Sequence, residues 1–159
     1  MTFDFWDIPN HLLEETAQAF TSGRHEIFVI WTSPLYNEGP VCAIRRCIVP
    51  RQEPGFSAGG AYAHIDGSEL SRIQFENYDR GERSVVQLHT HPSANVNMSL
   101  LDREWEVVKH VGALSIIVPS YGRAGLKGFA GVQVYEREPT DWRLWTRVEV
   151  EERLRIIDE

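Results

Sequence analysis

The stretch 87–102 reads QLHTHPSANVNMSLLD and contains three local patterns in succession. The residues up to His91 alternate with a period of two, which predicts a strand with His89 and His91 on one face. A polar, irregular segment follows, as expected of a loop. Ser99 then begins a helix that carries Asp102 in its first turn. The sequence therefore predicts a strand, a loop and a helix that bring Asp102 back towards the two histidines.

These residue types are the ones that bind a catalytic metal ion. A catalytic zinc takes three protein ligands from His, Asp, Glu or Cys and keeps a fourth position for water. His89 and His91 lie about 7 Å apart between Cα atoms, close enough to share an ion, and Asp102 supplies a third ligand. The Ser99 hydroxyl, one turn before Asp102, could stabilise an oxygen that becomes negative during the reaction, a contribution of about 3 kcal/mol.

Hydrolysis of an amide also needs a group that carries a proton from water to the leaving amine. Glu26 is the candidate, because it begins the apolar segment EIFVIW (26–31), which predicts an interior strand. A glutamate on such a strand is costly unless a polar or cationic group faces it. The alternative for Glu26 is an ordinary ion pair at a strand edge with Arg24 or Lys127.

Each part of this pattern also has an ordinary structural explanation. A His-x-His pair occurs on strands as two surface or hydrogen-bonded histidines. Ser99 with Asp102 matches a helix N-cap with an acidic residue in the first turn. The cap and the active-site roles are compatible, and the combination of same-face histidines, a loop, Ser and Asp favours the metal site.

The composition is typical of a globular protein. Of 159 residues, 42% are hydrophobic and 25% are charged, and the length fits one domain. The net charge of −7 argues against a surface that binds nucleic acid. No apolar run approaches the ~20 residues of a membrane helix, and the acidic start MTFDFWDIPN does not resemble a secretory signal. We expect Cys42 and Cys47 to be reduced thiols in a cytoplasmic protein.

Helical and strand patterns alternate along the chain, which predicts a single domain of the α/β (α+β) class. We expect helices over 10–20, 66–81 and 99–111, strands over 26–31, 41–50, 84–91, 114–120 and 129–136, and loops over 34–40 and 54–60, both loops being candidates for substrate contact. The expected apolar side of the second helix includes Phe75 and Tyr78, and that of the third includes Leu101 and Trp105. Within 136–159, the pattern from Trp142 onward leaves helix and strand open.

H-T-H-P, seven residues from His91 to Ser99, and then S-L-L-D closely resemble the JAMM motif of the JAB/MPN metalloprotease family. The usual form of that motif is an upstream Glu followed by H-x-H-x7-S-x-x-D. The resemblance covers, in order, an N-terminal helix, a strand bearing Glu, a middle helix, the histidine strand and the helix that begins at Ser-x-x-Asp. It implies one JAB/MPN domain over residues 1–159, with a curved, mixed β-sheet flanked by helices. Nothing specific covers the chain beyond Tyr135.

Carried over by residue, the resemblance implies that His89, His91 and Asp102 bind one zinc ion. It implies that Glu26 is the general acid and base and that Ser99 steadies the tetrahedral intermediate. Members of the family cleave isopeptide or peptide bonds after the C-terminal glycine of ubiquitin or ubiquitin-like proteins. The implied partners are a ubiquitin-like protein, its conjugates and the E1- and E2-like enzymes of the same pathway, with no nucleic acid and no membrane.

This sequence departs from the eukaryotic deubiquitinases of the family, which carry an inserted zinc-binding loop after the motif. Here no Cys and only His110 follow Asp102. The compact form resembles bacterial JAMM proteases, some of whose operons serve antiphage defence.

Two other functions remain open from the sequence. One is a hydrolase that acts on the C-terminus of a sulfur-carrier protein, and the other is a non-catalytic MPN scaffold with a vestigial zinc site. A structural zinc module would need a fourth protein ligand, which the spacing does not offer.

Overall fold

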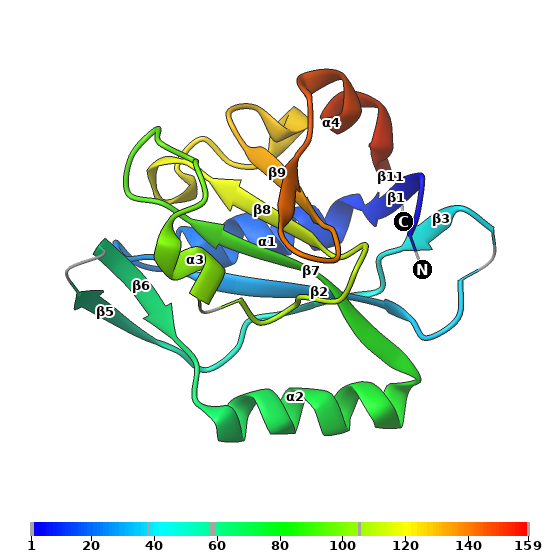
Figure 1. Ribbon diagram of the computed structural model, residues 1–159, viewed down its shortest axis with the longest axis horizontal. Helices are drawn as coiled ribbons and strands as arrows, with labels where there is room; N and C mark the ends of the chain where they lie inside the picture. The colour runs from blue at the N-terminus through cyan, green and yellow to red at the C-terminus, as the bar shows by residue number, and fades with distance from the viewer. Residues whose placement is uncertain (1, 38, 58–59, 105, 159) are drawn as a thin grey trace.

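The computed structural model describes residues 2–37, 39–57, 60–104 and 106–158 (Figure 1). Within them the helices are α1 (Asn10–Phe20), α2 (Gly67–Arg80), α3 (Leu100–Glu104) and α4 (Arg147–Arg153), with 3-10 turns η1 (Ser120–Gly122) and η2 (Lys127–Phe129). The strands are β1 (Phe5–Pro9), β2 (Phe28–Pro34), β3 (Val41–Ala43), β4 (Arg46–Ile48), β5 (Glu53–Ser57), β6 (Gly60–His64), β7 (Glu82–Thr90), β8 (Leu114–Val118), β9 (Gln133–Arg137), β10 (Trp142–Leu144) and β11 (Leu154–Ile157).

The main sheet has six strands in the order β10-β9-β8-β7-β2-β4. Its central strand β7 pairs antiparallel with β2 and parallel with β8, and the connection between the parallel strands contains α3. A smaller parallel sheet, β11-β1-β3, joins the C-terminal strand to the N-terminal one, while β5 and β6 form a separate hairpin. The expected α+β fold, a curved mixed sheet flanked by helices, is confirmed (Figure 1).

The two faces of the main sheet are covered differently. On the α1 face, Trp31 Nε1 donates a hydrogen bond of 2.8 Å to Thr16 Oγ1. The opposite face of β2 carries Phe28 and Ile30, which pack with Ile73 of α2. Because β2 is covered on both faces, its sequence is apolar on both, as an interior strand requires. On this second face, Phe28 pairs with His89 of β7, which belongs to the candidate site, and Ile30 pairs with Gln87 of the same strand.

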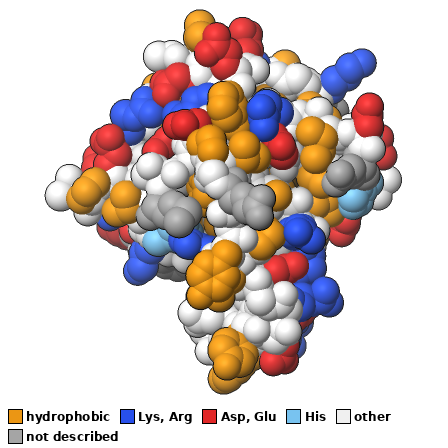
Figure 2. All heavy atoms as spheres, turned by 90° about the vertical axis from the view of Figure 1, so that its right-hand side faces the viewer, with side chains coloured by type: hydrophobic (Ala, Val, Ile, Leu, Met, Phe, Trp, Pro, Cys, Tyr) orange, Lys and Arg blue, Asp and Glu red, His pale blue; other side chains and the backbone are white. Residues whose placement is uncertain are grey.

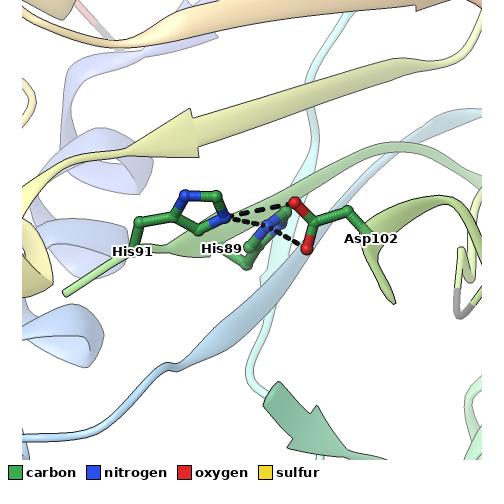
Figure 3. Close-up of side chains that lie close together, drawn as sticks. All are labelled: His89, His91 and Asp102. Carbon is green, nitrogen blue, oxygen red and sulfur yellow. Dashed lines mark hydrogen bonds and ion pairs between the residues drawn. The ribbon is translucent and has the colours of Figure 1, made fainter. Parts of the chain in front are cut away.

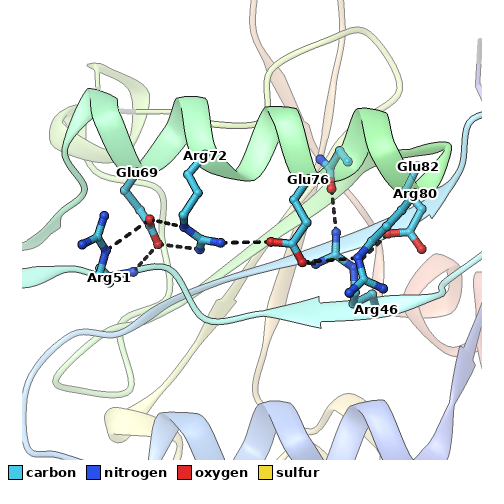
Figure 4. Close-up of polar contacts among 8 residues, drawn as sticks. Arg46, Arg51, Glu69, Arg72, Glu76, Arg80 and Glu82 are labelled. Carbon is cyan, nitrogen blue, oxygen red and sulfur yellow. Dashed lines mark hydrogen bonds and ion pairs between the residues drawn. The ribbon is translucent and has the colours of Figure 1, made fainter.

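Helix α2 lies along this second face and is tied to it by charges as well as by apolar contacts (Figure 4). We define the α2 polar ladder as Arg46, Arg51, Glu69, Arg72, Glu76, Arg80 and Glu82, which are linked by ion pairs. Gly81 ends the helix at a φ of 65°, a left-handed conformation that glycine adopts without strain. The ladder connects α2 to β4, β7 and the chain before β5.

Several predicted elements are wrong in their extent. The strand expected over 129–136 begins only at Gln133, because η2 occupies Lys127–Phe129. The single strand expected over 41–50 is divided into β3 and β4, because the backbone passes from one sheet to the other between them. Ile44 N donates to Asp7 O at 2.9 Å on the β1 side, and Arg45 N donates to Thr32 O at 2.8 Å on the β2 side. The loop expected over 54–60 belongs to the β5–β6 hairpin instead.

The helix expected over 99–111 is also wrong, because α3 ends at Glu104. The backbone N–H groups of Val107 and Val108 bond to a side chain of β7 rather than to carbonyls one turn earlier. Trp105 lies outside the described residues.

The expected burial of the α2 apolar side fails for Phe75 and Tyr78, which are 71% and 84% exposed. Figure 2 shows hydrophobic side chains on the lobe that projects below the body, where α2 lies.

Segment 136–159, which the sequence left open, contains β10, α4 and β11. Cys42 and Cys47 are buried and free. None of the described helices is long and apolar enough to span a membrane.

Candidate metal centre

The side chains of His89, His91 and Asp102 converge on one point (Figure 3). Nε2 of His89 lies 3.1 Å from Oδ1 of Asp102, and Nε2 of His91 lies 3.2 Å from Oδ2. The two Nε2 atoms are 3.2 Å apart. His89 is on β7 and His91 follows the last residue of that strand, so the alternation of the strand places both rings on one face. The structure thus brings together the three residues that the sequence pattern selected.

These separations fit a tetrahedral metal ion. The two Nε2 atoms are 3.2 Å apart, the separation of two ligands that bind one tetrahedral ion with bonds of about 2.0 Å, and one donor atom from each of the three side chains lies within 4.8 Å of the others. Imidazole nitrogen and carboxylate oxygen are donors that zinc takes, and other divalent transition ions accept the same set. Within the described ranges the group contains three side chains able to ligate a metal, which leaves room for a fourth ligand from outside the chain.

The charges of the cluster are carried by Asp102 and the two rings. Burial disfavours the ionised carboxylate, but hydrogen bonds with His89 and His91 outweigh this effect and hold the pKa of Asp102 below its usual range. Burial also opposes protonation of His91, yet its hydrogen bond with Asp102 raises the pKa of the ring overall. The carboxylate is therefore an anion within hydrogen-bond distance of both rings, and a divalent cation bound at this point would take the place of ring protons.

Different contacts fix the two rings. Nδ1 of His91 donates to the carbonyl oxygen of Asn95 at 2.8 Å, because a carbonyl can only accept. In the neutral ring this bond leaves the Nε2 lone pair facing the cluster. The His89 ring stacks on Phe28 with an interplanar angle of 8°, and its buried Nδ1 has no hydrogen-bond partner in the part of the chain that the structure describes.

Ser99 caps the helix that carries Asp102. Asp102 N donates to Ser99 Oγ at 3.1 Å, and Ser99 N donates to Asp102 Oδ2 at 2.8 Å. This reciprocal pair is a capping box with Asp in place of the usual Glu. The structural role expected of Ser99, that of a helix N-cap, is therefore confirmed. The Ser99 hydroxyl accepts in this pair and keeps its own proton free to donate. Its role towards an oxyanion stays a prediction.

Glu26 lies two residues before β2 instead of beginning it, and it is 8% exposed. With His89 and Asp102 it lines a cleft of about 30 Å³, room for one or two waters. Burial raises the pKa of Glu26 to about 7. The charge of His91 lowers this pKa, and the charge of Asp102 raises it, both by less than burial does. A much larger groove of about 640 Å³ lies beside α2 and does not include this cluster.

Thr90, between the two histidines, has a structural role that the sequence reasoning missed. Its Oγ1 accepts from Ile27 N at 3.0 Å, and its backbone N donates to Ile27 O at 3.2 Å. These bonds tie the backbone next to Glu26 to the strand that carries the histidines. A hydroxyl at the middle position of the motif was the available signal, but its partner is 63 residues away.

No model of a known protein family matches this chain. A protein of Sinorhizobium fredii named as a probable metalloprotease is 28% identical over 111 residues. The match covers 70% of this chain and 66% of that protein, slightly under two thirds of the relative's length.

A protein of Desulfitobacterium hafniense with a known solution structure shares the fold. The TM-score is 0.65, and the superposition covers 98% of this chain and 94% of that one at 11% sequence identity. At this identity the likeness concerns the fold alone. The chain is thus similar in sequence to a protein named as a probable metalloprotease, and it carries a His-His-Asp group that could hold a metal ion.

Proposed function

We propose that this chain is a zinc-dependent peptidase of the JAMM type that hydrolyses peptide or isopeptide bonds after the C-terminal glycine of a ubiquitin-like protein. The observation that carries the proposal is the convergence of His89, His91 and Asp102, two of which (His89 and Asp102) line a narrow cleft together with Glu26. The similarity to a probable metalloprotease supports the general class. The spacing of the motif and the three-ligand group support the narrower assignment.

In the proposed mechanism, His89, His91 and Asp102 hold the ion. Bound zinc would supply a water whose pKa is lowered to about 7 and would polarise the scissile carbonyl. Glu26 takes the proton of the attacking water and then gives it to the leaving amine. In the metal-free chain, burial raises the pKa of this carboxyl to about 7, the direction that makes a carboxylate a stronger proton acceptor.

Ser99 contributes in two ways. Its Oγ lone pair accepts from Asp102 N, which holds the helix start in place. Its hydroxyl proton is left to donate to the oxygen that becomes negative when water attacks the carbonyl. The hydrolysis forms no covalent acyl-enzyme, so Cys42 and Cys47 have no part in it.

The size of the cleft favours glycine at the scissile bond. Phe28, Tyr62 and Leu101 wall a space of about 30 Å³ beside the ligands, which a larger substrate side chain would overfill. Tyr62 belongs to β6, which among the described strands pairs with β5 alone. We propose that the extended tail of the ubiquitin-like protein adds to this hairpin by main-chain hydrogen bonds.

The test is cleavage of linear fusions in which ubiquitin, or a bacterial ubiquitin-like protein that ends in glycine, precedes a reporter domain. We expect the zinc-loaded protein to release the reporter, with mass spectrometry placing the cut after the terminal glycine. Glu26→Gln should keep its zinc and lose activity by about 10²–10⁴-fold. Asp102→Asn should lose both zinc and activity.

Three outcomes would contradict parts of the proposal. A purified protein that takes up no zinc would contradict a metallopeptidase and favour the scaffold. Zinc binding with release of an amino acid from a sulfur-carrier tail, and no cut in any fusion, would overturn the ubiquitin-like substrate. Full activity of Glu26→Gln would reject Glu26 as the proton carrier.

A further inference from the structure

Helix α3 carries Asp102 but cannot fix its position by packing. The helix has five residues, none of them buried, and Leu100 is 77% exposed. So short a helix is not stable by itself. Besides the bonds of Asp102 itself and those of Arg103 to Asp141 and to the Met98 carbonyl, the position of Asp102 depends on the segments that enter and leave α3.

The segment that enters α3 is held by Tyr135 of β9. The Tyr135 hydroxyl accepts from Met98 N at 3.1 Å and donates to Gln133 Oε1 at 2.7 Å. Tyr135 is 6% exposed and packs in one cluster with Met98. Its hydroxyl thus holds the backbone just before Ser99.

The segment that leaves α3 is held by Gln87 of β7. Gln87 Oε1 accepts from Val107 N at 3.1 Å and from Val108 N at 2.9 Å, and its Nε2 donates to Ser115 Oγ at 3.2 Å. Gln87 is 2% exposed. It precedes His89 by two residues on the same face of the strand, so the strand that carries His89 and leads directly into His91 also carries the group that holds the chain beyond Asp102.

A second attachment of the leaving segment ends on other strands. Glu106 Oε2 accepts from Trp142 Nε1 at 2.7 Å and from Arg137 at 3.4 Å. These partners belong to β10 and β9. Of the side-chain hydrogen bonds to 106–108 in the described chain, those of Gln87 are the ones that reach the histidine strand directly.

We propose that Gln87 and Tyr135 are positioning residues that hold Asp102 at its distance from the two histidines, so that metal affinity depends on them. The inference rests on the proposed metal-binding function of Asp102. When either tether is lost, α3 moves more freely, and metal binding must then order it. Loss of a group that bonds directly to a metal ligand weakens metal affinity by about 10–100-fold. The tethers act through the backbone on either side of Asp102, so we expect the lower end of that range, about 10-fold for each.

The experiment uses two substitutions that preserve shape. Gln87→Met keeps the side-chain length without the acceptor oxygen, and Tyr135→Phe removes the hydroxyl alone. Asn77→Leu is the matched control, because the buried Asn77 amide bonds to Ser84 and Arg46 and belongs to no part of the site. Zinc affinity is measured by competition with a chelator, and the stability of the metal-free protein is measured by urea unfolding.

We expect Gln87→Met and Tyr135→Phe to weaken zinc binding about 10-fold. Asn77→Leu should lower the stability of the metal-free protein and leave zinc affinity unchanged. Natural zinc affinity in both tether variants would overturn the inference.

A second measurement separates this inference from the proposed function, because it needs no metal. Hydrogen exchange of the Val107 and Val108 amides should be faster in Gln87→Met, and that of Met98 faster in Tyr135→Phe. If the natural chain binds no zinc, the proposed function fails. Unchanged hydrogen exchange at these amides in the variants would show that Gln87 and Tyr135 do not hold the segments on either side of α3.

Discussion

Glu26 and Glu69 are both buried glutamates, yet their surroundings drive them to opposite charge states. Glu69 is 1% exposed and lies between Arg72 and Arg51, whose hydrogen bonds, those of Arg72 foremost, lower its pKa to about 2. Glu26 is 8% exposed, and burial raises its pKa to about 7. Burial alone therefore does not decide the charge of a carboxylate, because guanidinium partners more than cancel its effect.

The same contrast separates the α2 polar ladder from the candidate metal centre formed by His89, His91 and Asp102. In the α2 polar ladder the chain supplies its own cations, and each carboxylate pairs with arginine (Figure 4). In the candidate metal centre the partners of Asp102 are two imidazoles, and no described Lys or Arg forms an ion pair with Asp102 or Glu26. The ladder is complete as a structural device, whereas the cluster combines perturbed pKa values with a cleft, which is typical of functional sites.

The largest expected effect comes from removing the charge of Glu26 in the metal-free protein. The folded-state pKa of about 7 is above the ordinary 4.5, so the natural fold loses stability as the pH rises from 4.5 to 7. The shift corresponds to about 3 kcal/mol. Glu26→Gln cannot ionise, so we expect it to match the natural protein near pH 4 and to be more stable above pH 7. Urea unfolding with a chelator present measures this, and parallel pH profiles would contradict it.

Glu69→Gln should show the opposite pH dependence. The folded-state pKa of about 2 is below 4.5, so the contribution of Glu69 is present above pH 4.5 and is lost as the pH falls towards 2. We expect a loss of about 1–2 kcal/mol at pH 7, modest because Arg72 and Arg51 face water. Acid unfolding curves that converge below pH 2 would support this, and a constant difference at every pH would contradict it.

The smallest effect compares the helix cap at the site with one elsewhere. Ser99→Ala and Thr146→Ala each remove a capping hydroxyl, and each should cost about 1 kcal/mol of stability. Thr146 caps α4, so its loss should leave zinc affinity unchanged. Ser99→Ala should weaken zinc binding as well, because the Ser99 cap orients Asp102. Equal zinc affinity in the two variants would show that the Ser99 cap is only structural.

The elements predicted well are those whose pattern is local. Helix α1, helix α2 and strand β7 lie within two residues of their expected bounds, because helical spacing and strand alternation follow from backbone geometry. The strand over 41–50 and the helix over 99–111 failed for a different reason. Their backbone N–H groups bond to partners far away in the sequence, such as Asp7, Thr32 and Gln87.

In the candidate site, as in the fold, the parts set by local sequence patterns were predictable and the contacts between distant segments were not. The spacing selected His89, His91 and Asp102 because a strand, a loop and a helix start form one local unit. Glu26 was selected as the acidic residue at the start of an apolar segment, but the sequence left open an ordinary ion pair with Arg24 or Lys127. The sequence did not predict the partners of Thr90 and Gln87, because each bond joins segments at least 20 residues apart.

The sequence by itself determined the donor set: two imidazoles on one strand face, a capped aspartate one loop later, and an acidic residue before an interior strand. These features follow from the side chains and from short-range backbone periodicity. Only the tertiary structure decided that the four groups meet, that Glu26 is desolvated rather than paired, and that Asp102 is held from both ends of a helix too short to hold itself. Separations and burial arise from contacts between distant segments, and a carboxylate's charge depends on those surroundings more than on its place in the chain.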